Sequence, residues 1–387
     1  MKTNVVDSAP STRRLKVAVL NRIFATTGGG AERYSIAVVE QLAERHDIHV
    51  FAQEIDHEWP GVTYHRIPCL SKKPRWLNQL WYAYATWRAT GTGFDIVHSH
   101  ENTWHGNVHT MHVKTVKRSL LGGRNGYQRA LRWLKVALNP RLITYLVLER
   151  ARMSARQDGA IVAVSQALQE ELTAQYPIAT PHIDVITPGV APPKRVLTQE
   201  QARALVGIPV EGRYVLFVAN DYARKGLTTL LEALRGMDGV RLLVVGHPVQ
   251  TVRYQTLAGT LGVQDRVHFL GTLQDMSPAY FAANVLAHPT LEDSFAMVVL
   301  EAMAHGLPVV VSSGTYCGIS SLLSHQVNAL ILEQPQDAQQ LRLLLLQALG
   351  DDKGGGALHL AALAFAQQHS WQGAAQVYER IYFQLAR

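Results

Sequence analysis

Cysteines are scarce in the sequence and long apolar runs are missing, and both features exclude whole classes of protein. The two cysteines among 387 residues, Cys69 and Cys317, are too few for a disulfide framework or a cysteine-rich metal cluster. A reducing cytosol is therefore the expected compartment. No stretch of eighteen or more apolar residues occurs, which argues against a transmembrane helix. Residues 1–14 lack the apolar centre of a secretory signal, and we expect a disordered lead-in there.

Several ligand-binding signatures are also absent. The sequence contains no Asp-x-Asp pair and no Gly-x-Gly-x-x-Gly loop. The first absence argues against a metal-dependent nucleotide-sugar site, and the second argues against a dinucleotide site. No nucleic-acid-binding module is recognisable either. We therefore expect no metal, no cofactor and no nucleic-acid partner.

Positive charge is concentrated in the first half of the chain. The formal net charge is +7 at pH 7, and residues 1–190 carry 23 lysines and arginines against 15 aspartates and glutamates. The remainder carries 14 against 15. This asymmetry favours an anionic partner for the first half, such as an anionic membrane or a phosphorylated glycolipid.

Two basic segments of the first half also contain aromatic residues. Residues 72–77 read Lys-Lys-Pro-Arg-Trp-Leu and lead into Trp81 and Tyr82. The second segment contains Lys114, Lys117, Arg118, Arg124, Arg129, Arg132, Trp133 and Lys135. Mixed basic and aromatic side chains suit an anionic bilayer surface. The sequence thus predicts a peripheral protein at the inner face of the cytoplasmic membrane, although each charge run alone is also typical of a solvated face.

Strand and helix patterns alternate along the chain, and the alternation restarts after the proline-rich residues 186–196. Buried strands are predicted at residues 15–20, 49–52, 95–99, 161–165, 213–220, 241–245, 267–270, 285–288 and 309–312. Helices are predicted at residues 34–43, 227–235 and 371–385. The pattern predicts two doubly wound α/β domains, residues 15–190 and 191–370, followed by a terminal helix at 371–387. Ligands of such folds bind at the carboxyl ends of the strands, here expected to face each other across a cleft.

Residues 288–310 carry the most informative motif, HPTLEDSFAMVVLEAMAHGLPVV. Asp293 and Glu301 lie eight positions apart, and the apolar residues between them favour a helix that starts after Asp293 and contains Glu301. Glu292 is a competing first acid, but the spacing favours Asp293. Free N–H groups at the start of such a helix bind an anion. They are expected at Phe295, Ala296, Met297 and Val298.

Two further loops follow predicted strands. Arg224 and Lys225, between a buried strand and a helix, suit a diphosphate because one offers a planar fork of donors and the other a compact charge. Gly28, Gly29 and Gly30 would allow the backbone to approach a ligand closely. The alternatives are a solvated surface pair in the first case and a simple tight turn in the second.

Histidines cluster at His98 and His100 and at His109 and His112. A histidine can hold a sugar or pass a proton because its pKa lies near the working pH. His105 and His109 also have a His-x3-His spacing, but no adjacent acid or cysteine completes a metal site.

Taken together, these motifs resemble those of the retaining glycosyltransferases of family 4, which adopt the GT-B fold. The usual pattern is Glu-x7-Glu followed by Ala-Met-Ala-x-Gly-x-Pro-Val-Val, and here Asp293 stands at the first acid. Pro188-Gly189, the Arg-Lys-Gly loop and His288-Pro289 are similar to those of the lipopolysaccharide core glucosyltransferase group. In that family the terminal helix crosses back to the first domain.

The resemblance implies transfer of a hexose, with retention, from a nucleotide diphosphate sugar such as UDP-glucose to a cell-envelope glycan or glycolipid. It implies that Arg224 and Lys225 bind the diphosphate, that Glu301 binds the ribose, and that Asp293 holds a donor-sugar hydroxyl. It places His112 near the transferred sugar, and Gly29 and Gly30 near the leaving phosphate. A non-catalytic nucleotide-sugar or glycan-binding protein is the alternative. A glycosidase needs no phosphate-binding cations, which disfavours a third interpretation of the two acids.

Overall fold

The computed structural model describes residues 13–26, 29–71, 73–121, 126–154, 159–177, 183–350 and 356–386. Residues 1–12 of the predicted lead-in lie outside the described residues, and so does Gly28. Two compact units divide the chain: the first comprises 1–110, 115–161 and 377–387, and the second comprises 111–114 and 162–376. The domain boundaries drawn from the sequence stay predictions.

The first sheet has, within the described residues, seven strands in the order β5-β3-β1-β6-β7-β8-β9. They are β1 (Lys16–Leu20), β3 (Asp47–Ala52), β5 (Val62–Arg66), β6 (Ile96–Ser99), β7 (Val108–Met111), β8 (Ala160–Ala163) and β9 (Ile183–Val185). The pairs β1–β3, β1–β6, β3–β5 and β6–β7 are parallel. A small separate sheet pairs β2 (Ile23–Phe24) with β4 (Glu54–Ile55).

The second sheet has six described strands in the order β12-β11-β10-β13-β14-β15, and every adjacent pair is parallel. Its strands are β10 (Arg213–Val218), β11 (Val240–Val245), β12 (Val267–Gly271), β13 (Val285–His288), β14 (Val309–Ser312) and β15 (Leu330–Leu332). Most residues of β10 and β11 and all of β13 and β14 are buried, as expected of parallel strands covered on both faces.

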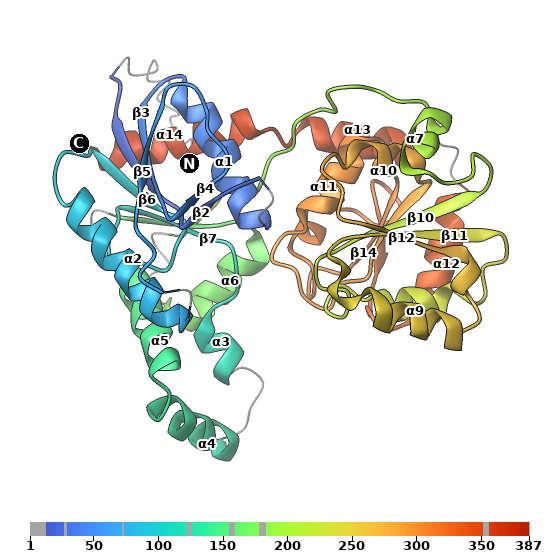
Figure 1. Cartoon of the computed structure of the whole chain (residues 1–387), viewed down its shortest axis with the longest axis horizontal. Coiled ribbons are helices and arrows are strands. Elements are labelled where there is room, and N and C mark those ends of the chain that lie inside the picture. Colours follow the sequence, from blue (N-terminus) through green and yellow to red (C-terminus); the bar gives the residue numbers. More distant parts are fainter. Residues whose placement is uncertain are drawn as a thin grey trace, which may run out of the picture. The chain divides into compact units, whose positions relative to one another are not determined.

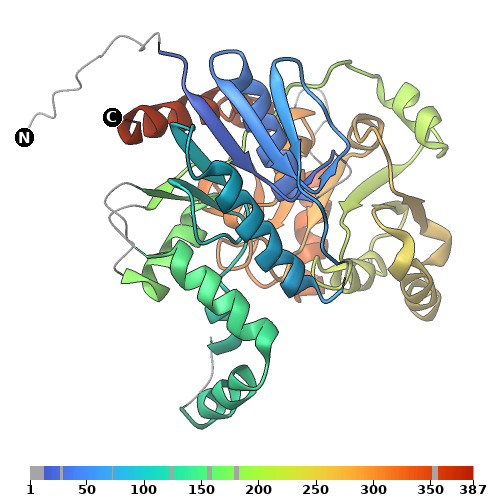
Figure 2. The same ribbon diagram turned by 60° about the vertical axis from the view of Figure 1, so that its left-hand side comes forward.

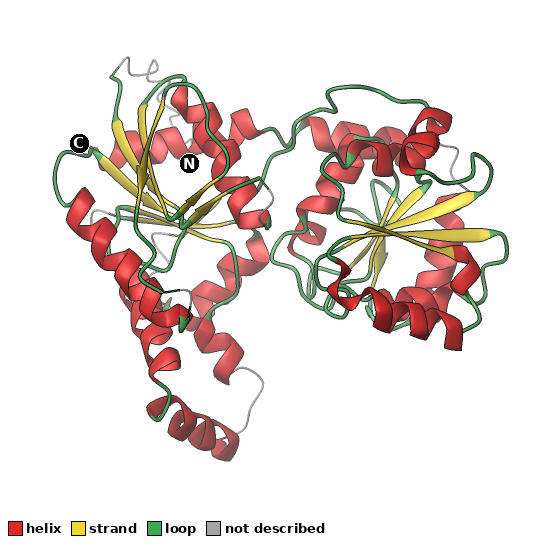
Figure 3. Ribbon diagram, viewed as in Figure 1, coloured by secondary structure: helices red, strands yellow, loops and turns green. Residues whose placement is uncertain are grey.

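Helices cover both faces of the second sheet (Figures 1 and 3). One layer contains α8 (Leu227–Leu234), α9 (Thr251–Thr260) and α12 (Ala338–Leu349), and the other contains α7 (Gln199–Val206), α10 (Ser277–Ala282), α11 (Met297–Ala304) and α13 (Ala357–Gln367). The core between the sheet and the first layer is built from Val, Leu and Tyr side chains of the strands, α8, α9 and α12. Burying these apolar side chains is the main force that holds the layers together.

In the first unit, α1 (Gly30–Ala43) follows β2, and α2 (Arg75–Thr90) packs against α5 (Pro140–Arg152). The short α3 (Val116–Leu121) and α4 (Gly126–Ala137) also contact α5. Figure 2 shows α4, in green, at the tip of the projection that these helices form away from the sheet. The helix α6 (Gln166–Gln175), which lies between β8 and β9 in the sequence, belongs to the second unit. None of the described helices is both long and apolar enough to cross a bilayer.

The second half of the terminal helix α14 (Trp371–Leu385) belongs to the first unit, where its buried tyrosine hydroxyls bond neighbouring residues. The Tyr382 hydroxyl lies 2.6 Å from His98 Nδ1, and the Tyr378 hydroxyl lies 2.7 Å from the Thr110 hydroxyl. Tyr378 also bonds the Tyr34 hydroxyl at 2.9 Å. These neutral hydrogen bonds satisfy polar groups that are buried. Without partners, the same buried groups would lower the stability of the fold.

Both sheets have the strand order of a doubly wound α/β fold, so the predicted α/β class is confirmed. The strand order reverses between β1 and β6 in the first sheet and between β10 and β13 in the second. Ligands of such folds bind at the carboxyl ends of the strands that flank this reversal. The loops that follow β10 and β13 are therefore the first place to look for a site.

Candidate active site

The predicted Arg-Lys-Gly loop and the predicted acidic motif come together at the reversal point of the second sheet. The first follows β10 and the second follows β13, its parallel neighbour. The Leu291 amide donates to the Arg224 carbonyl at 2.9 Å, which joins the two loops through their backbones. Gly226 adopts φ +83°, and a Cβ there would lie 2.0 Å from the Pro289 carbonyl oxygen. Glycine is therefore required where these loops cross.

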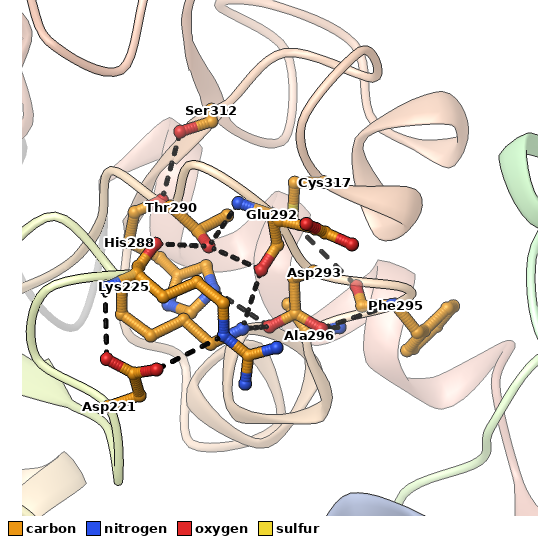
Figure 4. A network of polar contacts seen from close by, with 11 residues as sticks. Asp221, Lys225, His288, Thr290, Glu292, Asp293, Phe295, Ala296, Ser312 and Cys317 are labelled. Carbon is orange, nitrogen blue, oxygen red and sulfur yellow. Dashed lines mark hydrogen bonds and ion pairs between the residues drawn. The ribbon is translucent and has the colours of Figure 1, made fainter. Parts of the chain in front are cut away.

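Lys225, His288 and Asp293 converge in the network shown in Figure 4. The Lys225 ammonium lies 2.5 Å from Asp293 Oδ2 and 3.1 Å from the Glu292 carbonyl oxygen. His288 Nε2 lies 3.2 Å from the same Oδ2 atom. The side chains of Lys225 and Asp293 are 13% and 19% exposed, and that of His288 is 1% exposed. The ion pair is therefore largely shielded from water.

The other carboxylate oxygen of Asp293 shapes the start of α11. Its Oδ1 accepts from the amides of Phe295 at 3.3 Å and Ala296 at 3.0 Å. Ala296 precedes the helix in a left-handed conformation, with φ 73°, which a residue with a Cβ adopts at some cost. Two of the four amides predicted to face an anion are thus occupied by Asp293, whereas the predicted anion contacts of Met297 and Val298 stay predictions.

The electrostatics of this cluster follow from its burial. Burial by itself would raise the pKa of Asp293, but the His288 hydrogen bond and the Lys225 charge outweigh it and hold that pKa well below its usual range. For His288, burial lowers the pKa against the opposing hydrogen bond and charge of Asp293. At neutral pH the cluster therefore contains an ammonium, a carboxylate and a neutral imidazole.

Arg224 points its guanidinium to the surface, where its side chain is 55% exposed and its Nε lies 3.6 Å from Asp221 Oδ2. An exposed guanidinium beside a strand end is able to meet an incoming anion. Glu301 lies within α11, as the sequence predicts, and its Oε2 accepts from the buried Tyr280 hydroxyl at 2.7 Å. The predicted phosphate and ribose contacts of these side chains stay predictions.

The predicted site residues of the first half of the chain lie at the start of α1 and just after β7. Gly29 and Gly30 are exposed at the start of α1, and Glu32 Oε2 lies only 3.0 Å from where a Gly29 Cβ would be. His112 follows β7 directly and is half-buried. Among the described residues, no group of three or more His, Cys, Asp and Glu side chains is arranged to hold a metal ion.

Three residues of functional interest have no recognised role in the sequence pattern. The sequence shows His288 as half of a His-Pro pair, and the structure adds its contact with Asp293, five residues further along the loop that follows β13. Tyr280 holds Glu301 from a different helix, across a sequence separation of 21 residues. Glu101, after β6, bonds the Arg22 amide after β1, and burial raises its pKa despite the nearby Arg22 charge. The contacts of Tyr280 and Glu101 join residues that are distant in the sequence, and the contact of His288, five residues from Asp293, depends on how the loop after β13 turns, so sequence spacing carries no signal for them.

Comparison with protein families gives a consistent result over both halves of the chain. A family model described as glycosyl transferases group 1 matches residues 198–358. A second model, glycosyltransferase family 4, matches residues 28–193. The first match contains the whole network around Asp293, and the second contains the glycine loop and the histidine cluster.

Curated relatives include two transferases. The lipopolysaccharide glucosyltransferase WaaG of Escherichia coli is 27% identical over 222 residues, which cover 55% of this chain and 59% of the relative. The D-inositol 3-phosphate glycosyltransferase of Corynebacterium aurimucosum is 32% identical over 243 residues, 58% of this chain and 57% of the relative. The match to this chain therefore spans less than two thirds of the length of these relatives.

Solved structures match over almost the whole chain. The crystal structure of WaaG, described as a glycosyltransferase involved in lipopolysaccharide biosynthesis, superposes with a TM-score of 0.79 at 21% identity and covers 94% of this chain and 99% of its own. Anabaena HepE in complex with UDP-glucose superposes with a TM-score of 0.72 at 18% identity, covering 96% and 99%. At these identities the likeness establishes the fold. Together with the two family models, which match residues 28–193 and 198–358, this result makes the chain a member of glycosyltransferase family 4 with the GT-B fold.

Proposed function

We propose that the protein is a retaining hexosyltransferase that moves a hexose from a nucleotide diphosphate sugar to a cell-envelope glycan or glycolipid. One observation carries this proposal: Lys225 and the loop that begins α11 meet at the strand-order reversal of the second sheet. Parallel α/β sheets bind their ligands at such a point. A cation fixed there has the charge and the place needed to hold a diphosphate.

In this proposal, Lys225 and Arg224 bind the two phosphates and stabilise the charge that develops on the departing nucleotide. The ammonium is held in one position before the ligand arrives, so little reorganisation is needed as the glycosidic bond breaks. Arg224 is exposed and moves to the phosphates as they bind. With cations in these roles, the transfer requires no metal ion.

Glu301 and the start of α11 complete the proposed donor site. The Tyr280 hydroxyl fixes one oxygen of the Glu301 carboxylate, and the carboxylate accepts hydrogen bonds from the ribose hydroxyls. The amides of Met297 and Val298 lie in the first turn of α11, where N–H groups and the helix dipole favour an anion. His112, Gly29 and Gly30 serve the transferred sugar and the leaving phosphate.

UDP-glucose is the proposed donor, and the lipopolysaccharide core is the proposed acceptor. Support comes from named relatives: HepE has been solved with UDP-glucose, and WaaG acts in lipopolysaccharide biosynthesis. Calorimetric titration with UDP, GDP and ADP, followed by nucleotide release from the matching sugar donors, tests the proposal. We expect tight binding of UDP and turnover without added metal, including in the presence of EDTA. Binding without turnover on any envelope acceptor would favour the non-catalytic alternative.

An anionic membrane surface is the proposed docking partner of the first unit, on the cytoplasmic side. Residues 59–148 carry 13 lysines and arginines but only two acids, Asp95 and Glu101. Tyr127 and Trp133 of α4 are 75% and 51% exposed, so they are available to enter the headgroup region. We expect sedimentation with vesicles that contain phosphatidylglycerol, loss of binding at high salt, and no binding to phosphatidylcholine alone. Equal binding to both lipids would contradict an electrostatic attraction.

A further inference from the structure

Side-chain hydrogen bonds join α10 to α11, and they meet at Glu301. Both helices lie in one helical layer of the second unit (Figure 1). The Tyr280 hydroxyl of α10 donates to Glu301 Oε2 at 2.7 Å. His305, directly after α11, lies with Nδ1 2.7 Å from the Glu301 carbonyl oxygen and with Nε2 2.9 Å from the Ser277 hydroxyl of α10. The backbone and the carboxylate of Glu301 are thus both tied to α10.

The donor in this arrangement has little freedom to move. Tyr280 is 1% exposed, and its ring centroid lies 4.8 Å from that of His305. A carbonyl oxygen only accepts, so His305 Nδ1 carries a proton and donates to Glu301, which fixes the orientation of the imidazole ring. On the other side of α10, Arg203 of α7 is buried and donates from Nε to the Ala282 carbonyl oxygen at 3.0 Å. The Tyr280 hydroxyl is therefore presented by a helix that is itself held in place.

The acceptor is a side chain that would otherwise be mobile. Glu301 is half-buried within α11, and ordering a glutamate side chain when a ligand binds costs conformational entropy. The bond from Tyr280 orders the carboxylate beforehand, so a ligand that donates to it meets a preorganised acceptor. An ionised carboxylate has about four lone-pair positions. One bonded phenol is therefore compatible with two further donors from a single ligand.

We propose that Tyr280 is a positioning residue that aims the Glu301 carboxylate at the 2′ and 3′ hydroxyls of the nucleotide, and so makes the site selective for ribonucleotides over 2′-deoxyribonucleotides. This inference rests on the proposed function, which places Glu301 at the ribose. A site built to accept a hydrogen bond from a hydroxyl rejects an analogue that lacks it. Because Glu301 is only half-buried, water replaces part of the lost bond, and a moderate preference is expected.

Calorimetric titration with UDP and 2′-deoxy-UDP tests the inference. We expect the wild type to bind UDP about tenfold more tightly, the factor for one hydrogen bond to a charged group. In Tyr280→Phe the carboxylate is no longer aimed, so UDP should weaken more than 2′-deoxy-UDP, which has one hydroxyl fewer to lose. The ratio of the two affinities should then fall severalfold, toward one. Equal weakening of both ligands would mark a merely structural role and overturn the inference.

The matched control is Tyr254→Phe. Tyr254 is another buried tyrosine of the second unit, in α9, and its hydroxyl has no hydrogen-bond partner within the described residues. Its removal should leave the ratio of affinities as in the wild type, which shows that losing a buried phenol does not by itself change the preference. A ratio that falls as far in this variant as in Tyr280→Phe would contradict the inference.

A double-mutant cycle tests whether Tyr280 acts through Glu301. Glu301→Ala removes the carboxylate, so the preference for UDP over 2′-deoxy-UDP should disappear. Adding Tyr280→Phe should then change the ratio no further, because no carboxylate is left to position. Circular dichroism checks the fold of each variant. A further fall in the double variant would show that Tyr280 acts by another route and would overturn the inference.

The inference and the proposed function fail in distinguishable ways. Tight binding of UDP with an unchanged ratio in Tyr280→Phe would leave the transferase in place and remove the positioning role. A wild type that binds none of UDP, GDP and ADP would refute the proposed function and the role of Tyr280 with it. Should GDP or ADP bind in place of UDP, the same comparison is made with the 2′-deoxy form of that nucleotide.

Discussion

One buried polar network from each unit illustrates two different kinds of chemistry. In the second unit, Lys225, Asp293 and His288 form a charged cluster at the end of β13. In the first unit, the neutral hydroxyls of Tyr378 and Tyr382 bond Thr110 and His98 beneath α14. A charged cluster at a strand end is able to act on a ligand, whereas a neutral network packed under a helix holds structure. Buried polarity alone therefore does not mark a site, and charge is what distinguishes the Lys225 cluster from the network under α14.

The largest expected effect tests whether the charged cluster acts on a ligand. Lys225→Ala removes the only cation bonded to Asp293 among the described residues. We expect the rate of transfer to fall by about 10²–10³-fold, the range found when a preorganised donor to a developing charge is removed. Nucleotide release measures the rate, and circular dichroism checks that the fold persists. Turnover within twofold of the wild type would mean that the cluster is as structural as the network of the first unit.

The neutral network should matter for stability rather than for turnover. Tyr382→Phe removes the hydroxyl that lies 2.6 Å from His98 Nδ1, and we expect a loss of about 1–3 kcal/mol because a buried partner is left unsatisfied. Urea unfolding measures it. The control is Tyr254→Phe: Tyr254 is buried in α9 of the second unit, and its hydroxyl has no hydrogen-bond partner within the described residues. Equal losses in the two variants would show that the bond to His98 contributes nothing.

The pH dependence of stability sharpens the comparison, because both units contain described histidines whose pKa is lowered, chiefly by burial. They are His46 and His65 in the first unit and His268 and His288 in the second. A lowered folded-state pKa means that the unfolded chain takes up protons first as the pH falls. Stability is therefore complete above about pH 6.5 and declines below it, by at most about 1.4 kcal/mol per pH unit for each histidine.

Urea unfolding between about pH 7.5 and 5.5 measures this decline, and His288→Gln should make it shallower. The pKa of Asp293 is also held low, so its contribution persists through this window and is lost only near pH 4 and below. Stability that rises on acidification would contradict the assigned directions of all four histidines.

The smallest effect concerns backbone strain at the site. Ala296 and Gln326 are the non-glycine residues with positive φ among the described residues. Glycine at either position should raise the free energy of unfolding by up to about 1 kcal/mol, since it removes the Cβ clash of the left-handed region. Ala296→Gly should also weaken UDP binding because the turn becomes less rigid, while Gln326→Gly should not. Identical UDP affinity in the two variants would show that the backbone strain at Ala296 does not contribute to ligand binding.

Local patterns predicted the second unit better than the first. The strands β13 and β14 and the helix α14 have the predicted bounds, and Asp293 and Glu301 lie before and within α11 as predicted. The two strands are continuous apolar runs, and α14 repeats its apolar residues at helical spacing, so local pattern is enough to predict them. The short edge strands β2, β4 and β5 went unpredicted, because few of their residues are buried and their pairing partners are distant in sequence.

The segment between β7 and β8 shows why charge patterns were hard to interpret. Its basic and aromatic residues predicted a membrane-binding surface, and the structure adds that most of them lie on α3 and α4; Lys114 precedes α3, and Arg124 lies outside the described residues. The contact between His288 and Asp293 was beyond any sequence pattern, because it depends on the side-chain direction at the end of β13. The left-handed turn at Ala296 was equally hidden, since alanine carries no signal for that conformation.

The most direct test of the account is the affinity of UDP for the wild type and for Lys225→Ala, measured side by side by calorimetry with UMP as the reference ligand. The account expects UDP to bind the wild type much more tightly than UMP, and expects that difference to disappear in the variant while UMP affinity stays the same. A preference for UDP over UMP that is unchanged in Lys225→Ala would contradict it.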